Sequence, residues 1–176
     1  MQKNWYVLYT KPQSEKKVAA LLAKRKIENF IPYVNVEMPR FKKSKLVLKP
    51  LFKSYVFAYS TEQEIQSLRL TEGVISVLYW LGKPAIIAEA EVEAIREFTS
   101  DYQNIDLEKL PVNSIFMEKS FYKSAYTIEG NLVAIRNKTI KINLPSLGYA
   151  MIANLKEESV FGLDKSMSRN YSFAQS

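Results

Sequence analysis

The sequence has 176 residues, a mass of 20.3 kDa, a net charge of +7 and a pI near 9.4. This length fits one or two small domains, and a hydrophobic fraction of 47% is enough for a buried core. The chain contains no cysteine and no histidine, which excludes disulfides, thiolate nucleophiles, cysteine zinc sites and histidine-based acid–base triads.

The remaining residues do not indicate catalysis either. The acidic residues are scattered, and neither a Walker A pattern nor a dinucleotide-binding glycine pattern is present. We therefore expect a protein that is not an enzyme, with no catalytic residue, no metal site and no cofactor. No apolar segment approaches the roughly 18 residues that cross a bilayer, so we expect a cytoplasmic monomer that does not contact membranes.

The positive charge is concentrated in the first part of the chain. Residues 1–100 hold 16 Lys and Arg against 10 Asp and Glu, a net charge of +6, whereas the remaining residues have a net charge of +1. An excess of Lys and Arg over Asp and Glu favours anionic partners, of which nucleic acid is the commonest. The sequence therefore predicts that residues 1–100 face such a partner.

Hydrophobic periodicity and turn residues divide these hundred residues into alternating strands and helices. In chain order we expect a strand over 4–10, a basic helix from Ser14 to about residue 29, a long hairpin over 30–60, a short helix capped by Thr61, a strand over 73–81 and a helix over 88–100. This order predicts an α/β sandwich, an antiparallel sheet with helices on its faces.

The rest of the chain divides into three parts. Residues 101–112 are polar and aperiodic and are expected to form an interdomain linker. Residues 113–163 contain several short segments with strand alternation, which predict a small β-barrel, and residues 164–176 are expected to be a disordered tail. The predicted fold class is therefore α+β, with a domain over residues 1–100 followed by the barrel.

Two basic features of the first domain are candidates for phosphate contacts. One is the hairpin tip, with Arg40, Lys42, Lys43 and Lys45, and the other is the helix face that carries Lys24 to Lys26. Lys and Arg neutralise phosphates with little sequence demand, although charge runs are commonly solvated surface. Two such features in one domain favour nucleic acid.

The segment "KPLFKSYVFAYS", residues 49–60, concentrates aromatic rings on one strand. Tyr55, Phe57 and Tyr59 share one face, and Val56 and Ala58 share the other. Both faces are covered, or one is exposed for a partner. Periodicity alone favours packing of the rings in the core and leaves the second alternative open.

Three ordered segments resemble the N-terminal domain of the NusG family of transcription elongation factors. They are "WYVLYTKPQSEKKVAALL", "KPLFKSYVFAYS" and "LTEGVISVLYWLGKPAII". The sequence resembles the specialised RfaH/UpxY-like antiterminators more than a housekeeping NusG, because "PLFKSYVFA" replaces the usual "FFPGYVLV" and the second domain is atypical. The end of the second domain, "EGNLVAIRNKTIKINLPSLGYAMIANL", is similar to the family's KOW β-barrel, while the glycines that open that motif are absent.

The resemblance implies a function and a set of contact residues. The protein would bind the clamp helices of the RNA polymerase β′ subunit, contact the opposite β lobe and suppress pausing and termination on a specific long operon, such as a surface-polysaccharide operon. The implied polymerase-binding residues are Tyr9, Phe52, Tyr55, Phe57 and Leu81. The residues implied to contact the non-template DNA strand are Lys11, Lys24, Arg25, Arg69 and Thr71.

Two alternatives remain open from the sequence. A housekeeping NusG would couple polymerase to a ribosomal protein or termination factor through the KOW-like domain. A stand-alone RNA-binding module would use the basic hairpin and the small barrel. If the second domain docked on the aromatic patch, it would autoinhibit the first. Residues 131–144 are rich in β-branched side chains, which predicts strands in this segment and not a helical hairpin.

Overall fold

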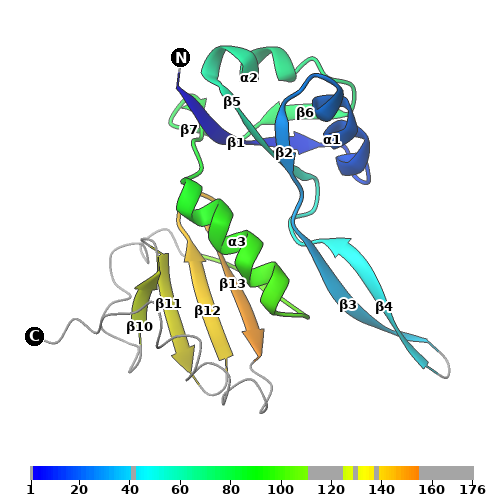
Figure 1. Cartoon of the computed structure of the whole chain (residues 1–176), viewed down its shortest axis with the longest axis vertical. Helices are drawn as coiled ribbons and strands as arrows, with labels where there is room; N and C mark the ends of the chain where they lie inside the picture. Colours follow the sequence, from blue (N-terminus) through cyan, green and yellow to red (C-terminus); the bar gives the residue numbers. More distant parts are fainter. Residues whose placement is uncertain (1, 41–42, 111–124, 129–130, 137–138, 155–176) are drawn as a thin grey trace, which may run out of the picture.

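The computed structural model describes residues 2–40, 43–110, 125–128, 131–136 and 139–154 (Figure 1). The helices are α1 (Glu15–Lys24), α2 (Glu62–Leu68) and α3 (Glu89–Asp101). The strands up to the predicted linker are β1 (Lys3–Thr10), β2 (Glu28–Phe30), β3 (Tyr33–Arg40), β4 (Lys43–Pro50), β5 (Tyr55–Thr61), β6 (Val74–Val77), β7 (Tyr79–Trp80) and β8 (Lys83–Pro84). The later strands are β9 (Asp106–Lys109), β10 (Ala125–Ile128), β11 (Asn131–Arg136), β12 (Thr139–Leu144) and β13 (Tyr149–Asn154).

The first sheet has the order β2-β5-β1-β6, and its strands pair antiparallel. On one face, Tyr6 and Leu8 of β1 pack against α1 and α2, which contribute Val18, Leu22, Ile65 and Leu68 to the same core. On the other face, Trp5, Val7 and Phe57 belong to a second core. The predicted mixture of helices and antiparallel strands is confirmed, and both faces of the sheet are covered.

Local sequence signals explain the shorter elements. The predicted cap at Thr61 is confirmed, because its Oγ1 accepts a hydrogen bond from the Glu64 N–H at 3.2 Å while the Glu64 carboxylate accepts from the Thr61 N–H at 3.1 Å. This reciprocal capping box starts α2. The first helix ends at Lys24, earlier than predicted, because Lys26 adopts a left-handed conformation with φ of 58° that leads into β2.

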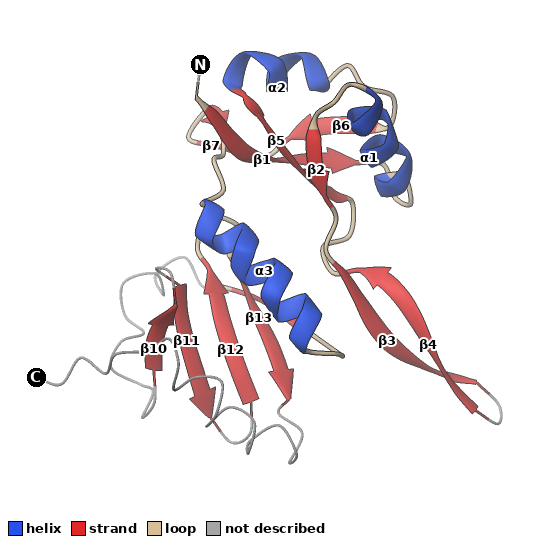
Figure 2. Ribbon diagram, in the orientation of Figure 1, coloured by secondary structure: helices blue, strands red, loops and turns tan. Residues whose placement is uncertain are grey.

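A second sheet follows, with the order β10-β11-β12-β13-β9. Figure 2 shows α3 lying between this sheet and the first one. Val92, Ile95 and Phe98 of α3 join Trp5 of the first sheet and Met151 of the second in one continuous core. The helix expected to close the first domain is therefore shared by the two sheets.

Two features of the second half differ from the sequence-based expectation. The expected linker, residues 101–112, contains β9, whose Leu107 is the register partner of Met151 in β13. In the part of the chain that the structure describes, the five strands form an open sheet and not a closed barrel. The described segments of residues 131–144 are strands, as predicted.

The predicted hairpin is confirmed as β3 and β4, which pair along their whole length. It is shorter than the predicted 30–60, because residues 55–61 form β5 and pair with β1 and β2 in the first sheet. It extends away from both sheets in Figure 1. Its base is tied to the segment after α3, since the Asn104 N–H donates to the Asn35 carbonyl at 3.3 Å and the Asn104 side-chain oxygen accepts from the Glu37 N–H at 3.4 Å. Within the described residues, no helix is long and apolar enough to cross a membrane.

Candidate partner-binding surfaces

The loop between β4 and β5 orients the aromatic residues of the candidate surface. Ser54 has a φ of 63°, and its N–H donates to the buried Glu15 carboxylate at 2.7 Å. The Ser54 carbonyl accepts from the Thr10 N–H at 2.8 Å. This turn is therefore fixed by α1 and β1, and it sets the positions of Phe52 and Tyr55.

Four of the five predicted polymerase-binding residues form one aromatic cluster. Tyr9 and Tyr55 are directly opposite each other in the β1–β5 register, with ring centroids 6.0 Å apart at 82°. Phe52 stacks on Tyr55 at 6.0 Å and meets Phe57 edge-on at 5.9 Å. Such offset and edge-on contacts are favourable between aromatic rings, so the cluster is a rigid unit.

Exposure separates the members of this cluster. Phe57 and Phe52 are 0% and 3% exposed, Tyr55 is half-buried and Tyr9 is 42% exposed. Phe57 and Phe52 are therefore core residues in this arrangement, and only the two tyrosines present ring surface. Leu81 is 89% exposed on the β7–β8 turn and lies outside the aromatic cluster.

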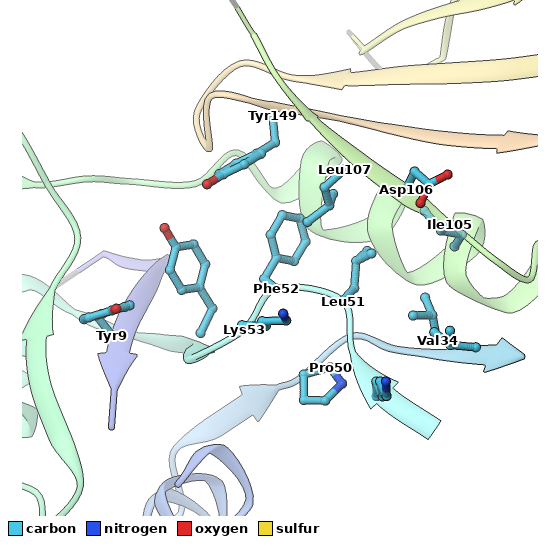
Figure 3. Close-up of a pocket in the computed structure, with 13 residues that line it drawn as sticks. Tyr9, Val34, Pro50, Leu51, Phe52, Lys53, Ile105, Asp106, Leu107 and Tyr149 are labelled. Carbon is cyan, nitrogen blue, oxygen red and sulfur yellow. The ribbon is translucent and has the colours of Figure 1, made fainter. Parts of the chain in front are cut away.

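The second sheet covers part of the aromatic cluster. The Tyr149 ring of β13 meets Phe52 edge-on at 5.9 Å. Figure 3 shows Tyr149 and Leu107 approaching Phe52 from the second sheet, with Tyr9 on the opposite side. Burial raises the pKa of the Tyr55 phenol, and the neighbouring Tyr149 and Tyr9 raise it further. The hydroxyl of Tyr55 therefore remains a protonated donor at neutral pH.

A polar contact also joins the two parts of the molecule. The Glu91 carboxylate of α3 accepts hydrogen bonds from the Ser146 N–H at 3.0 Å and from the Ser146 hydroxyl at 2.8 Å. Glu91 is 4% exposed, and its Oε2 atom is buried without a hydrogen-bond partner. Burial raises the pKa of the Glu91 carboxyl, and the two bonds from Ser146 only partly offset this. The β12–β13 turn is thus held against α3.

Most of the predicted DNA-binding residues lie along one edge of the first domain. The Arg25 guanidinium donates to the Thr71 hydroxyl at 3.4 Å, and the Lys11 N–H donates to the Gly73 carbonyl at 2.9 Å. Lys24 is exposed at the end of α1. Arg69 turns toward the β7 strand and lies over the Tyr79 ring at 5.9 Å. Arg25 therefore joins the end of α1 to the segment after α2, and we call the exposed residues Lys11, Lys24 and Arg25 on this part of the first domain the basic edge.

The predicted hairpin residues form a separate group. Lys45 is exposed on β4, on the hairpin that projects away from the sheets (Figure 1). The side chains of Arg40, Lys42 and Lys43 lie outside the described residues. The basic hairpin and the basic end of α1, which the sequence identified as two candidates for phosphate contacts, therefore belong to separate surfaces.

Sequence reasoning missed several residues of these surfaces. Tyr149 and Leu107 reach the aromatic cluster through distant strand pairing, for which a single sequence carries no signal. Glu91 looked like an ordinary first-turn acidic residue of a helix. Trp80 is 69% exposed beside Leu81. The turn residues that follow it in "YWLGKP" were a signal that this Trp lies in a short hairpin.

The fold and its surfaces define an α+β protein with a partly exposed aromatic cluster of the kind that anchors protein–protein contacts. The family description "NusG: Transcription termination factor nusG" matches residues 3–96, more than half of the chain. The chain therefore belongs to the NusG family, as the sequence resemblance predicted, and this membership places it among transcription elongation factors. A search of curated protein sequences found no match.

Solved structures share the fold. The structure described as "Domain interaction in Thermotoga maritima NusG" matches with a TM-score of 0.50 and 17% sequence identity, covering 88% of this chain and 94% of that chain. The structure described as "Crystal Structure of MjSpt4:Spt5 complex conformation A" covers 85% of this chain and 99% of that chain, with 16% identity and a TM-score of 0.34. The first likeness shows the fold alone, and the second is too low to support an argument.

Proposed function

We propose that this protein is a non-enzymatic, cytoplasmic transcription antitermination factor of the specialised RfaH/UpxY-like type. It binds the clamp helices of RNA polymerase and suppresses pausing and termination on a specific long operon. The observation that carries the proposal is the Tyr9–Tyr55 pair, which presents ring surface on a rigid aromatic cluster. Rigid aromatic side chains bury a large area at low entropic cost and are frequent interface anchors.

Burial assigns different roles to the rings that the resemblance grouped together. Tyr9 and Tyr55 make the polymerase contact, whereas Phe52 and Phe57 support them from below. Because Tyr149 packs on Phe52 and also lies near Tyr55, the proposal includes movement of the second sheet away from the aromatic cluster when the clamp helices bind. A contact between domains is also what the description of the Thermotoga maritima NusG structure names.

The basic edge supplies the nucleic-acid contact in this proposal. Lys11 and Arg25 both contact the segment after α2, through Gly73 and Thr71, and Lys24 is exposed next to Arg25 in the sequence. Exposed Lys and Arg bind the phosphates of the non-template strand, and Thr71 adds a hydroxyl beside Arg25. Glu72 pairs with Lys17 next to this edge and reduces its net charge, so binding is expected to be moderate and salt-dependent.

Transcription in vitro past a pause site and a terminator tests the proposal. Wild-type protein is expected to shorten pauses and increase read-through, and Tyr9→Ala is expected to lose most of this effect while remaining folded. The control is Ile86→Ala, which removes an exposed apolar side chain that lies outside the aromatic cluster. The proposal is wrong if wild-type protein changes neither pausing nor read-through.

Two binding measurements, with a ribosomal protein and with RNA in the absence of polymerase, separate the two alternatives from this proposal. A housekeeping NusG would act on polymerase without dependence on a particular operon sequence and would bind a ribosomal protein. A stand-alone RNA-binding module would bind RNA tightly without polymerase, and Tyr9→Ala would leave that binding unchanged.

A further inference from the structure

We propose that the cavity between the aromatic cluster and the second sheet binds a small organic anion with an aromatic or aliphatic body. The cavity has a volume of about 640 Å³, within the range of sites that hold small molecules. Its walls come from β1, the base of the β3–β4 hairpin, the loop before β5, the segment of β9 and the start of β13.

Apolar and aromatic side chains form most of the wall. Figure 3 shows Phe52 and Leu51 at the centre of the cavity, Val34 on one side and Leu107 and Ile105 on the side of the second sheet. Phe52 is nearly buried, and it is held by its stacking on Tyr55 and its edge contact with Tyr149. A preformed apolar wall of this kind favours a ligand with a flat or aliphatic body.

The polar groups of the lining are mainly hydrogen-bond donors. Lys49 and Lys53 contribute two ammonium groups, and Tyr9, Tyr55 and Tyr149 contribute three phenol hydroxyls. The Tyr55 hydroxyl is protonated at neutral pH, as any tyrosine with an ordinary pKa near 10.0 would be, and burial raises its pKa further. Ammonium and hydroxyl donors form their strongest hydrogen bonds with anionic oxygens, so a carboxylate or phosphate group is the complementary anion.

One acidic residue also lines the cavity. Asp106 is exposed on β9, at the wall that belongs to the second sheet, whereas both lysines belong to the first domain. Two cations against one carboxylate leave the lining with a net positive charge. We therefore expect the anionic group of the ligand to lie on the side of Lys49 and Lys53 and its apolar body to lie against the partly exposed side chains of the lining, among them Val36 and Leu107.

A ligand at this position would also regulate the protein. Because both parts of the molecule contribute to the cavity, filling it stabilises the arrangement in which the second sheet covers Phe52. This consequence rests on the proposed function, in which Tyr9 and Tyr55 bind polymerase. The ligand is then expected to compete with the polymerase clamp.

Titration of the full-length protein with 1-naphthyl phosphate, 1-naphthol and inorganic phosphate tests the site without polymerase. We expect 1-naphthyl phosphate to bind one site per chain, at least about tenfold more tightly than either partial probe. Lys53→Glu is expected to weaken its binding by about tenfold or more. Lys83→Glu makes the same charge change on an exposed lysine outside the cavity and is expected to have no effect.

Three results would overturn the site. They are the absence of saturable binding of 1-naphthyl phosphate, equal binding of 1-naphthol or inorganic phosphate, and equal losses in Lys53→Glu and Lys83→Glu. Tyr149→Phe provides a second variant that keeps the ring, and we expect it to weaken binding by about threefold through loss of one hydroxyl. Failure of polymerase binding would leave these titrations unchanged, so the two proposals can fail separately.

Discussion

Neighbouring rings of one strand have different physical roles in this protein. Phe57 and Tyr55 lie on the same face of β5, yet Phe57 is 0% exposed whereas Tyr55 is half-buried. The difference arises because Phe30 and Phe52 both pack on Phe57, while Tyr55 lies toward the end of the sheet beside Tyr9. Burial therefore determines which ring stabilises the fold and which is available to a partner.

This difference predicts unequal effects of two alanine substitutions. Phe57→Ala is expected to lower the free energy of unfolding by about 3–5 kcal/mol, because it leaves a cavity in a closed core. Tyr9→Ala is expected to lower it by about 1 kcal/mol or less, because much of the ring is already in water. Urea denaturation of the two variants measures both values. A loss for Tyr9→Ala as large as that for Phe57→Ala would contradict the assignment of Tyr9 as a surface ring.

The buried carboxyl of Glu91 predicts a pH dependence. Its pKa is raised above the model-compound value of 4.5, mainly by burial, so the docked form binds the proton more tightly than the unfolded form. The stabilising contribution of this proton is complete below pH 4.5 and is lost as the pH rises through the raised pKa. Thermal unfolding from pH 4 upward is expected to show this loss in wild type and not in Glu91→Gln.

Glu97→Gln is the control for this titration, because Glu97 is an exposed carboxylate on the same helix. Its profile should parallel that of wild type. If the difference between wild type and Glu91→Gln were independent of pH, the Glu91 carboxyl would not titrate differently in the docked form.

Among the elements, α3 holds the two sheets together. On one side, the Arg96 guanidinium lies over the Phe30 ring at 4.8 Å and the Trp5 ring at 5.4 Å, and it pairs with Glu28 at 3.6 Å. On the other side, Glu91 contacts Ser146. The helix thus carries one polar contact to each sheet in addition to its apolar side chains.

The stacking of Arg96 predicts a measurable contribution to stability. Arg96→Ala is expected to lower the free energy of unfolding by about 1–2 kcal/mol, through loss of the cation–π contacts and of the packing of its stem. Arg25→Ala removes an exposed arginine that only hydrogen-bonds Thr71 and Ser67, and we expect a loss of about 0.5 kcal/mol or less. Denaturant titrations measure both losses. If the two variants lost the same free energy of unfolding, the contacts of Arg96 with the rings would add no stability.

Elements with local signals could be predicted from the sequence, and elements that depend on distant pairing could not. The cap at Thr61 and the β3–β4 hairpin are determined by residues close in sequence. By contrast, Asp106–Lys109 has a polar sequence and becomes β9 only because β13, more than forty residues later, offers a free edge. A polar, aperiodic pattern alone therefore did not predict this strand.

The candidate site, like the fold, could be predicted only in part from the sequence. The family resemblance located the aromatic cluster, since Tyr9, Phe52, Tyr55 and Phe57 do come together. It could not indicate which rings are buried, because exposure depends on what packs on them. Tyr149 covers part of the cluster only through the position of the whole second sheet, which periodicity does not specify.

At the scale of the whole molecule, the described structure is a closed arrangement of two sheets around α3 (Figure 2). Its junction combines the apolar core around α3, the ring contact between Phe52 and Tyr149, and the hydrogen bonds between Ser146 and Glu91. The Oε2 atom of Glu91 has no hydrogen-bond partner, which reduces the stability of the closed form. A junction of this composition can open without unfolding the first sheet, which has its own core under α1 and α2.

Ser146→Asp is the sharpest test of this opening. The new carboxylate would face the buried Glu91 carboxylate, and like charges in a buried site are strongly unfavourable. We expect the second sheet to detach and the affinity for a clamp-helix fragment of polymerase to rise by about fivefold or more. Ser100→Asp places the same charge on the exposed side of α3 and should leave the affinity unchanged. Hydrogen exchange of β1 and β5 should stay slow in both variants, which shows that the first sheet remains folded. Detachment of the second sheet without a gain in affinity would mean that the closed arrangement does not restrict polymerase binding.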